Sequence, residues 1–485
     1  MQDQTLATAA NQAAGTPVQQ SSERPAALGY ICFISVVAAL GGFLFGFDSG
    51  VINGTVTALS KAFNSDSVAT GFNVASVLLG CAVGALCAGP AADRFGRKPV
   101  MLLTALVFAI SAWGSGAADS ATAFILYRVL GGLGIGAASV LAPAYISEVA
   151  PAAWRGRLAT LQQLAIVLGL FVAFYSNYLI ANAAGSAEAP LWLDLPAWRW
   201  MFWMELVPSV LFLLGVLLIP ESPRYLVASG QLYQASAVFQ RIAPGDADAQ
   251  VLAVRQSLQG EHKPRLRDLV SAGSGWLGLR PVVWVGIGLS VFQQFVGINV
   301  VFYYGAELWQ AAGFDESQSL LINVLAGTTN ILSTFIAIAL IDKVGRKPLL
   351  VVGSAGMTLS LAALTLIFAS AGYDASGKLA LTDSMGTLAL VAANGFVICF
   401  GLSWGPVVWV LLGEMFNNRI RGAALAVAAS AQWLANFAIT MTFPVMLASV
   451  GLAGAYGFYT VSALLSLVFV LRAVSETKGK QLEEM

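Results

Sequence analysis

Three ionisable residues, Asp48, Arg128 and Glu205, stand inside long apolar segments of the 485-residue chain. A charge in such surroundings is costly and by default indicates a functional site. An arginine keeps its own proton, but it can change the carboxylate with which it pairs. A carboxylate that loses this partner in a dry site binds a proton more readily. The three residues therefore predict a proton switch, and a permanent structural ion pair is the alternative.

A second group consists of uncharged amide and aromatic side chains in other apolar segments: Gln163, Gln293, Gln294, Asn299, Tyr303, Asn330, Trp409, Gln432, Trp433 and Asn436. Asn299 and Tyr303 share one face of a helix, and Gly297 permits a local break that brings the two glutamines before it round to that face. Amides that match hydroxyl groups, beside an apolar surface for the ring, are what a sugar site needs. The alternative for each amide is an interhelical hydrogen bond, and for each tryptophan it is packing.

The composition indicates that lipid surrounds the elements that hold these side chains. Of the residues, 58% are hydrophobic and 10% are charged, with a mean hydropathy of +0.76, against about 25% charged in soluble domains. This excludes a cytosolic enzyme, a disordered scaffold and a nucleic-acid binder. The formal net charge of zero suggests no partner. Four cysteines without CxxC spacing and the single His262 argue against a metal site or histidine catalysis.

Apolar segments long enough to cross a bilayer recur from residue 28 onward. We count twelve: 28–57, 69–91, 99–118, 121–146, 157–181, 200–220, 281–306, 317–341, 348–371, 386–415, 422–444 and 450–474. A polar stretch separates the sixth from the seventh. The predicted division is a disordered tail at 1–27, a six-helix bundle at 28–220, a helical linker domain at 221–280, a second bundle at 281–474 and a tail at 475–485.

The charged loops predict both orientation and duplication. All but four of the 25 Lys and Arg residues lie in the tails, the linker and alternate connections. By the positive-inside rule these parts, including both termini, are cytoplasmic. The loops 93–98 and 342–347 repeat each other, as a duplicated bundle would. We expect the charges of these regions to form a cytoplasmic gate whose ion pairs close one face: Asp93, Arg94, Arg97, Glu148, Arg155, Glu221, Arg224, Asp342, Arg346, Glu414 and Arg421.

Taken together, the motifs resemble those of the sugar porters of the major facilitator superfamily, and the likeness is strongest to bacterial xylose–proton symporters. They are GFDSGVING at 46–54, the two loops at 93–98 and 342–347, PESPR at 220–224, QQFVGIN at 293–299 and GPVVW at 405–409. The resemblance implies an all-α membrane protein with twelve transmembrane helices in two pseudo-symmetric six-helix bundles, the major facilitator fold. It implies no cofactor and no metal.

The resemblance also implies roles for single residues. Phe45 matches an aromatic residue beside the sugar, and the positions that match sugar-contacting residues are Gln163, Gln293, Gln294, Asn299, Asn330, Trp409 and Gln432. Proton-coupled members carry Asp at the position of Asp48, where the uniporting glucose transporters of animals carry Asn. Two residues depart from the pattern. Leu170 replaces a glutamine of the xylose symporters, and Ser475 replaces a proline near the C-terminus.

These observations predict a proton-coupled symporter of a monosaccharide, either a hexose such as glucose or a pentose such as xylose. We expect it to be a multi-pass protein of the inner cell membrane, monomeric, with lipid, sugar and protons as its only partners. Three alternatives stay open. In a sugar uniporter the pair of Asp48 and Arg128 would be structural, a non-transporting sugar sensor would have longer tails, and a drug–proton antiporter would need a wide apolar cavity instead of amides.

Overall fold

The computed structural model describes residues 25–151, 154–242, 247–259, 266–270, 278–373, 379–417 and 420–478. These are almost entirely helical, as a bilayer requires, because a helix satisfies its backbone N–H and C=O groups internally. Eleven helical segments are long and apolar enough to span a membrane. The last of them is two helices, which meet at Gly451 with φ of 67°. Most of the expected tail at 1–27 lies outside the described residues, but residues 25–27 already belong to the first helix.

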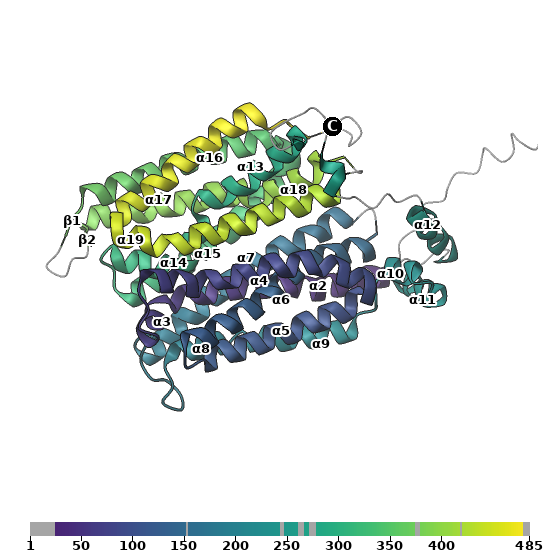
Figure 1. Ribbon diagram of the computed structural model, residues 1–485, viewed down its shortest axis with the longest axis horizontal. Helices are drawn as coiled ribbons and strands as arrows, with labels where there is room; N and C mark the ends of the chain where they lie inside the picture. The colour runs from purple at the N-terminus through teal and green to yellow at the C-terminus, as the bar shows by residue number, and fades with distance from the viewer. Residues whose placement is uncertain are drawn as a thin grey trace, which may run out of the picture.

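The long helices form two groups that lie side by side (Figure 1). The first group, called the N-terminal half below, contains α2 (Pro25–Val51), η1 (Ile52–Gly54), α3 (Val56–Ala62), α4 (Ser67–Phe95), α5 (Arg97–Ala117), α6 (Ala121–Val149), α7 (Arg155–Ala184), α8 (Ala197–Trp203) and α9 (Leu206–Leu218). In this half α4 and α6 approach closely: a Cβ on Gly132 of α6 would lie 1.9 Å from the carbonyl oxygen of Val77. Such backbone contact leaves little space around Arg128, one turn earlier on α6.

The second group, the C-terminal half, contains α13 (Pro281–Phe295), α14 (Ile298–Ala311), α15 (Glu316–Val344), α16 (Arg346–Ser370), α17 (Asp383–Leu402), α18 (Trp404–Met415) and α19 (Arg421–Ala473). A short antiparallel hairpin, β1 (Gly372–Tyr373) and β2 (Leu379–Ala380), connects α16 to α17. The N-terminal ends of α4 and α15 are capped alike, because Asp66 accepts from the N–H of Ala69 and Asp315 from that of Gln318.

The segment that connects the two halves forms a small group of short helices at one end of the molecule (Figure 1): α10 (Pro223–Ala228), α11 (Leu232–Ile242) and α12 (Ala247–Gln259). A further turn, η2 (Leu266–Leu269), contacts α19 of the C-terminal half. The predicted linker at 221–280 contains these helices, and parts of it lie outside the described residues. The guanidinium of Arg241 lies 4.6 Å from the ring centroid of Tyr30. This cation–π contact ties α11 to the start of α2.

Three of the expected spans are broken. We expected the sixth and the tenth to be continuous helices, and for the seventh we expected only that Gly297 permits a break. The seventh span consists of α13 and α14, which meet at Gly297. The φ of 89° at this position suits a residue without Cβ. The sixth breaks between α8 and α9 at Met204 and Glu205, and the tenth at Ser403. Broken helices inside a membrane are tolerated where polar groups or a cavity take up the freed backbone groups. The breaks therefore coincide with the polar interior.

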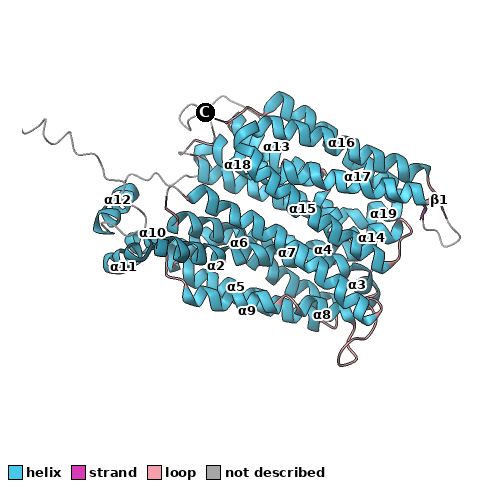
Figure 2. Cartoon of the chain, turned by 180° about the vertical axis from the view of Figure 1, so that it is seen from behind, coloured by secondary structure: helices cyan, strands magenta, loops and turns pink. Residues whose placement is uncertain are grey.

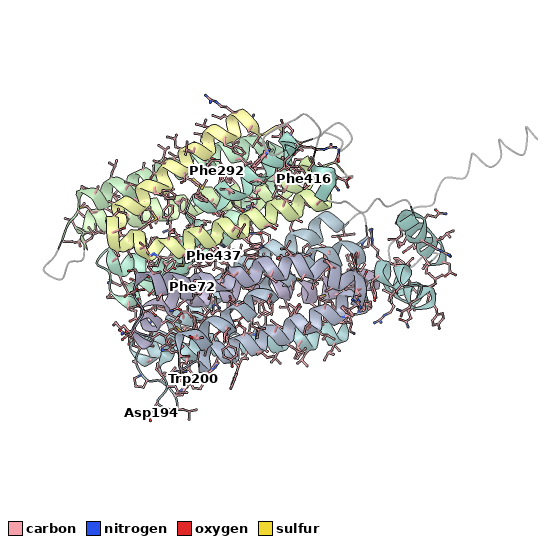
Figure 3. The ribbon with its side chains drawn as sticks, viewed as in Figure 1. Phe72, Asp194, Trp200, Phe292, Phe416 and Phe437 are labelled. Carbon is pink, nitrogen blue, oxygen red and sulfur yellow. The ribbon has the colours of Figure 1, made fainter. Side chains whose placement is uncertain are left out.

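The two halves meet along a seam formed by α2, α4 and α7 on one side and α14, α15 and α19 on the other (Figure 2). The rings of Phe72 and Phe437 meet edge to face across it, 6.4 Å apart (Figure 3). Hydrogen bonds join the halves at the end opposite the linker: Ala187 N–H donates to Glu316 over 2.7 Å, and Asn323 donates to Asn53 over 2.8 Å. The halves are therefore closed at that end.

Candidate functional site

The structure brings the three predicted intramembrane charges together. Arg128 donates from Nη1 to Oδ1 of Asp48 over 2.5 Å, and both side chains are almost completely buried. Glu205 lies at the break between α8 and α9, 1% exposed, and interacts electrostatically with Asp48 and Arg128. The guanidinium also lies 5.8 Å from the ring centroid of Phe202. One cation therefore stands among two carboxylates and an aromatic face.

This ionic centre is incompletely bonded. Oδ2 of Asp48, Nε of Arg128 and Oε1 of Glu205 are buried without a hydrogen-bond partner. Each unsatisfied buried polar atom costs about 1–3 kcal/mol, and more if it is charged. One arginine also cannot balance two ionised carboxylates, so a proton on either acid would neutralise the centre. The arrangement is suited to taking up and releasing one proton.

The predicted amides of the C-terminal half form a connected network. Gln293 is its central residue: its Oε1 accepts from Gln432 over 2.7 Å, and its Nε2 donates to the carbonyl oxygen of Trp404 over 2.8 Å. Gln294 accepts from Asn299 across the break at Gly297. The Trp404 carbonyl lies directly after the break at Ser403. The two broken helices thus hold one another through a glutamine side chain.

Other predicted sugar residues lie near this network without all joining it. Asn436 donates to the Tyr303 hydroxyl over 3.4 Å. Phe45 of α2 and Trp433 of α19 face each other across the seam, with ring centroids 5.9 Å apart. The remaining three are not bonded to the network: Gln163 is half-buried on α7, Asn330 is buried on α15 with its Oδ1 against Gly401, and Trp409 is 43% exposed on α18.

The charged loops form one cluster in each half. In the N-terminal half Arg97 binds Glu148 over 2.9 Å and Asp93 over 3.1 Å. In the C-terminal half Arg346 binds Glu414 over 2.7 Å and Asp342 over 3.0 Å. We expected such pairs to close one face of the protein. Each of these pairs joins helices of the same half, and their role as a gate stays a prediction.

A second carboxylate completes each cluster from the segment that follows the last span of that half. Glu221 accepts from the backbone N–H groups of Arg97 and Lys98 at 3.0 and 3.2 Å. Glu476 accepts from those of Arg346 and Lys347 at 3.0 and 2.9 Å. Each thereby satisfies free N–H groups at a helix start. Glu476 was missed as a site residue, although the Glu-Thr-Lys that follows the last span mirrors the position of Glu221.

The two carboxylates differ in their surroundings. Burial raises the pKa of Glu221 despite its backbone hydrogen bonds. For Glu476, burial also acts to raise the pKa, but bonds from the N–H groups of Lys478, Arg346, Lys347 and Thr477 outweigh it and lower the pKa below the ordinary value. Equivalent positions in the two halves therefore hold carboxyl groups of different acidity.

The remaining predicted gate residues are peripheral. The Arg94 guanidinium lies 5.2 Å from the ring centroid of Phe95, and Arg421 donates from Nε to the carbonyl oxygen of Phe416 over 3.3 Å. Arg224 stands in α10, beside the segment of Glu221. The side chain of Arg155 lies outside the described part of the structure.

Two further asparagines close the seam at the end opposite the linker and were not predicted. Asn53 donates to the carbonyl oxygen of Phe302 over 2.9 Å and accepts from the N–H of Ala306 and from Asn323. Asn53 is 2% exposed, as is Asn323. The signal was present, since both are amides inside apolar segments, but their pairing across the seam needed the fold.

Comparisons with known proteins agree with this architecture. A model of the family described as "Sugar (and other) transporter" matches residues 34–485. The glucose transport protein of Synechocystis sp. is 54% identical over 97% of this chain and 100% of its own length. The D-xylose-proton symporter of Escherichia coli is 38% identical over 94% of this chain and 95% of its own length.

Solved structures show the same arrangement. The partially occluded, inward open conformation of the xylose transporter XylE from E. coli superposes with a TM-score of 0.80 at 36% identity, over 93% of this chain and all of that chain. Its inward open conformation gives a TM-score of 0.80 at 37% identity, over 94% of this chain and 99% of that one. The chain is therefore a major facilitator transporter and not an enzyme, and it belongs to the sugar transporter family.

Proposed function

We propose that this protein carries a monosaccharide together with a proton across the inner cell membrane by alternating access. The buried centre of Asp48, Arg128 and Glu205 is the observation that carries the proposal, since it combines one fixed cation with two carboxylates. The relatives named as xylose–proton and arabinose–proton symporters support the coupling. The positions of Lys and Arg support cytoplasmic termini.

The amide network supports a sugar as the second substrate. Gln293, Gln294 and Asn299 are neutral donors and acceptors beside the break at Gly297, and Gln432 reaches them from α19. They bond to each other or to the freed carbonyl of Trp404. A sugar hydroxyl can replace such partners at little cost, because it both donates and accepts. Phe45 and Trp433 offer apolar ring surface beside them. The 54% identical glucose transport protein makes glucose the first sugar to test.

In the proposed cycle the proton gradient supplies the work. A pH difference gives about 1.4 kcal/mol per unit, and the membrane potential gives about 2.3 kcal/mol per 100 mV. A proton on Asp48 would weaken its bond to Arg128, and Glu205 would then be the partner still ionised. Asp48 lies on α2, Arg128 on α6 and Glu205 at the break between α8 and α9. A change in pairing among them would therefore change how these helices pack against one another.

The test is Asp48→Asn, which keeps the shape of the side chain but removes its titration. Labelled-sugar uptake into vesicles is measured with and without an inward proton gradient, together with exchange of internal for external sugar. We expect the variant to lose gradient-driven accumulation and to keep exchange. Asp194→Asn, on the exposed loop before α8 (Figure 3), is the matched control and should accumulate sugar normally.

Two outcomes would contradict the proposal. Accumulation that survives in Asp48→Asn would show that the proton binds elsewhere. A wild-type protein that exchanges sugar but never accumulates it would be a uniporter, in which the pair of Asp48 and Arg128 is structural.

A further inference from the structure

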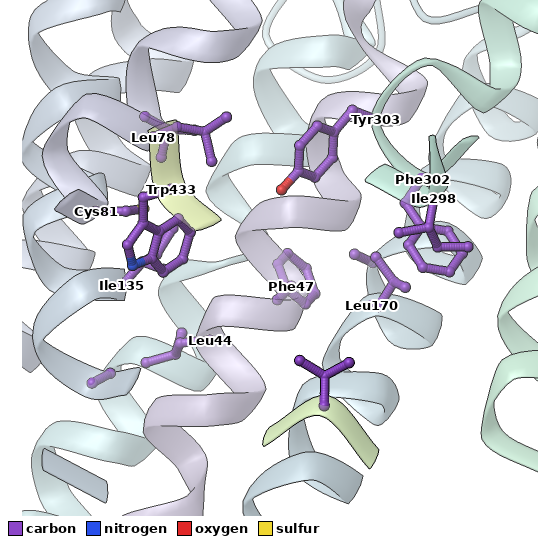
Figure 4. Packing of buried hydrophobic residues seen from close by; sticks show 14 of the residues in the cluster. Leu44, Phe47, Leu78, Cys81, Ile135, Leu170, Ile298, Phe302, Tyr303 and Trp433 are labelled. Carbon is purple, nitrogen blue, oxygen red and sulfur yellow. The ribbon is translucent and has the colours of Figure 1, made fainter. Parts of the chain in front are cut away.

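A small cavity lies between the ionic centre and the sugar residues. Arg128 lines it from α6, Ser49 and Phe45 from α2, Cys81 from α4 and Tyr303 from α14, and aliphatic side chains complete the wall. In Figure 4 the hydroxyl end of Tyr303 points towards the α4 residues of this wall. The cavity thus touches a residue of the proposed proton site and two of the proposed sugar site.

The volume available to the centre of a water-sized sphere is about 10 Å³. One ordered water needs about 10–15 Å³ by this measure, with two to four polar partners. The wall offers the hydroxyls of Ser49 and Tyr303 and the guanidinium of Arg128. Nε of Arg128 is buried and has no hydrogen-bond partner in the described structure. The cavity therefore has both the size and the polar groups that one water requires.

The charged and titratable groups around Asp48 come from four neighbouring elements. They are Arg128 from α6, Glu205 from the break between α8 and α9, Cys81 from α4 and Tyr303 from α14. Tyr303 is the member of this set that also contacts a further residue of the proposed sugar site, because its hydroxyl accepts from Asn436. A chain of polar contacts from the proposed proton site to the proposed sugar site therefore passes through the Tyr303 hydroxyl.

We propose that the cavity binds one water molecule, which hydrogen-bonds Ser49, Arg128 and Tyr303 and couples the ionic centre to the sugar site. The inference rests on the proposed proton-coupled function. When Arg128 changes its carboxylate partner, it withdraws or offers a hydrogen bond to this water. The water then changes the hydrogen bond available to Tyr303, and thereby the orientation of its hydroxyl towards Asn436. Ser49 is a positioning residue, because it acts on Tyr303, directly and through the water, and contacts neither sugar nor proton.

The test compares Ser49→Val with Ser49→Thr, which have the same shape and differ in whether the hydroxyl is kept. Sugar affinity is measured for both variants and the wild type at low and high pH. Coupling between two sites typically changes affinity 5- to 150-fold, and we expect a wild-type ratio of at least about 5-fold. Ser49→Val should bring the ratio towards about 1, while Ser49→Thr keeps the wild-type ratio. Sugar exchange should persist in both variants.

A Ser49→Val variant with the full wild-type ratio would overturn the proposal. A wild-type ratio of 1 would instead contradict the symporter itself. The water is tested separately by infrared difference spectra of the wild-type protein upon sugar binding. A water O–H band that shifts in H2¹⁸O and is lost in Ser49→Val supports the site. Absence of such a band in the wild type would overturn it, even if the variants failed to fold.

Discussion

The ends of the two halves next to the linker are built alike, whereas their membrane interiors are not. Each loop, 93–98 or 342–347, places an arginine on a glutamate of its own half, at 2.9 Å in the first and 2.7 Å in the second. A second glutamate then binds the N–H groups at the start of the next helix in each half. Duplication of a six-helix unit explains this likeness.

The interiors have diverged in charge. The N-terminal half buries two carboxylates with one arginine, whereas the polar interior of the C-terminal half is mainly a network of uncharged amides. The C-terminal half also holds the carboxylate of Glu307 on α14, one oxygen of which is buried without a hydrogen-bond partner in the described structure. A charge in the membrane is costly, so it is kept where a proton is handled, whereas a sugar needs only neutral partners. Under the proposed function, the repeated ends serve motion in both halves, while one interior serves the proton and the other the sugar. Coupling between the proton site and the sugar site must then cross the seam between the two halves.

The largest effect should come from Arg128→Met. Removing one partner of a buried ion pair typically costs about 3–5 kcal/mol, because it leaves an uncompensated charge. Here two carboxylates, Asp48 and Glu205, would face each other. We expect a large loss of folded protein, measured by size-exclusion profile and thermal unfolding in detergent. Arg199→Met is the control, since its partner Asp119 is 90% exposed; equal stability of the two variants would contradict an ionic interior.

Much of the fold was predictable because its signals are local. Span lengths, charged loops and repeated motifs each depend on a short stretch of sequence, and the family match confirms the architecture that they indicated. The breaks at Met204 and Ser403 were not predicted, although Pro208 and Pro406, each in the first turn of the helix that follows a break, were signals for them. They depend on polar partners from distant helices, such as Gln293 for the Trp404 carbonyl.

The candidate site was predictable in its membership but less so in its pairing. Depth along each span placed Asp48, Arg128 and Glu205 together, because helix rise is regular. Spacing alone did not show that Gln293 would bond Gln432, or that Asn53 would meet Asn323. Such contacts depend on how helices rotate about their axes, which three-dimensional packing decides.

The second largest effect should come from variants in the amide network. Gln293→Ala removes the centre of the amide network, and a sugar hydroxyl left unpaired costs about 1–3 kcal/mol, which weakens binding about 5- to 100-fold. Gln163→Ala should weaken sugar binding in the same range if that residue contacts sugar from the N-terminal half. Equilibrium sugar binding measures both. Gln310→Ala, near the C-terminal end of α14, is the control; unchanged affinity in both test variants would show that the amides serve only packing.

A smaller difference in stability should distinguish the charged clusters at the linker-side ends of the two halves. Arg97→Ala leaves Glu148, whose side chain is 9% exposed, whereas Arg346→Ala leaves Glu414, which is 31% exposed and also accepts from Thr477. An unpaired buried acceptor costs about 1–3 kcal/mol, so the N-terminal variant should be the less stable. We expect slower net transport in both variants, with sugar binding retained. Thermal unfolding and uptake rates measure this; equal losses in stability would contradict the asymmetry.

The smallest effect concerns the acidity of the two helix-capping carboxylates. The pKa of Glu476 is lowered on folding, so its contribution to stability is present above the unfolded pKa of about 4.5 and is lost as pH falls through the folded pKa. Burial raises the pKa of Glu221, so its contribution is present at low pH and declines as pH rises from about 4.5 through the folded value.

The Gln variant of each residue does not titrate. The thermal midpoint of each variant is therefore subtracted from that of the wild type between about pH 4 and pH 7. As pH falls, the wild-type advantage should shrink against Glu476→Gln and grow against Glu221→Gln. Differences of the same sign would show that the two ends are electrostatically equivalent, and the likeness between the halves would then extend to their acidity.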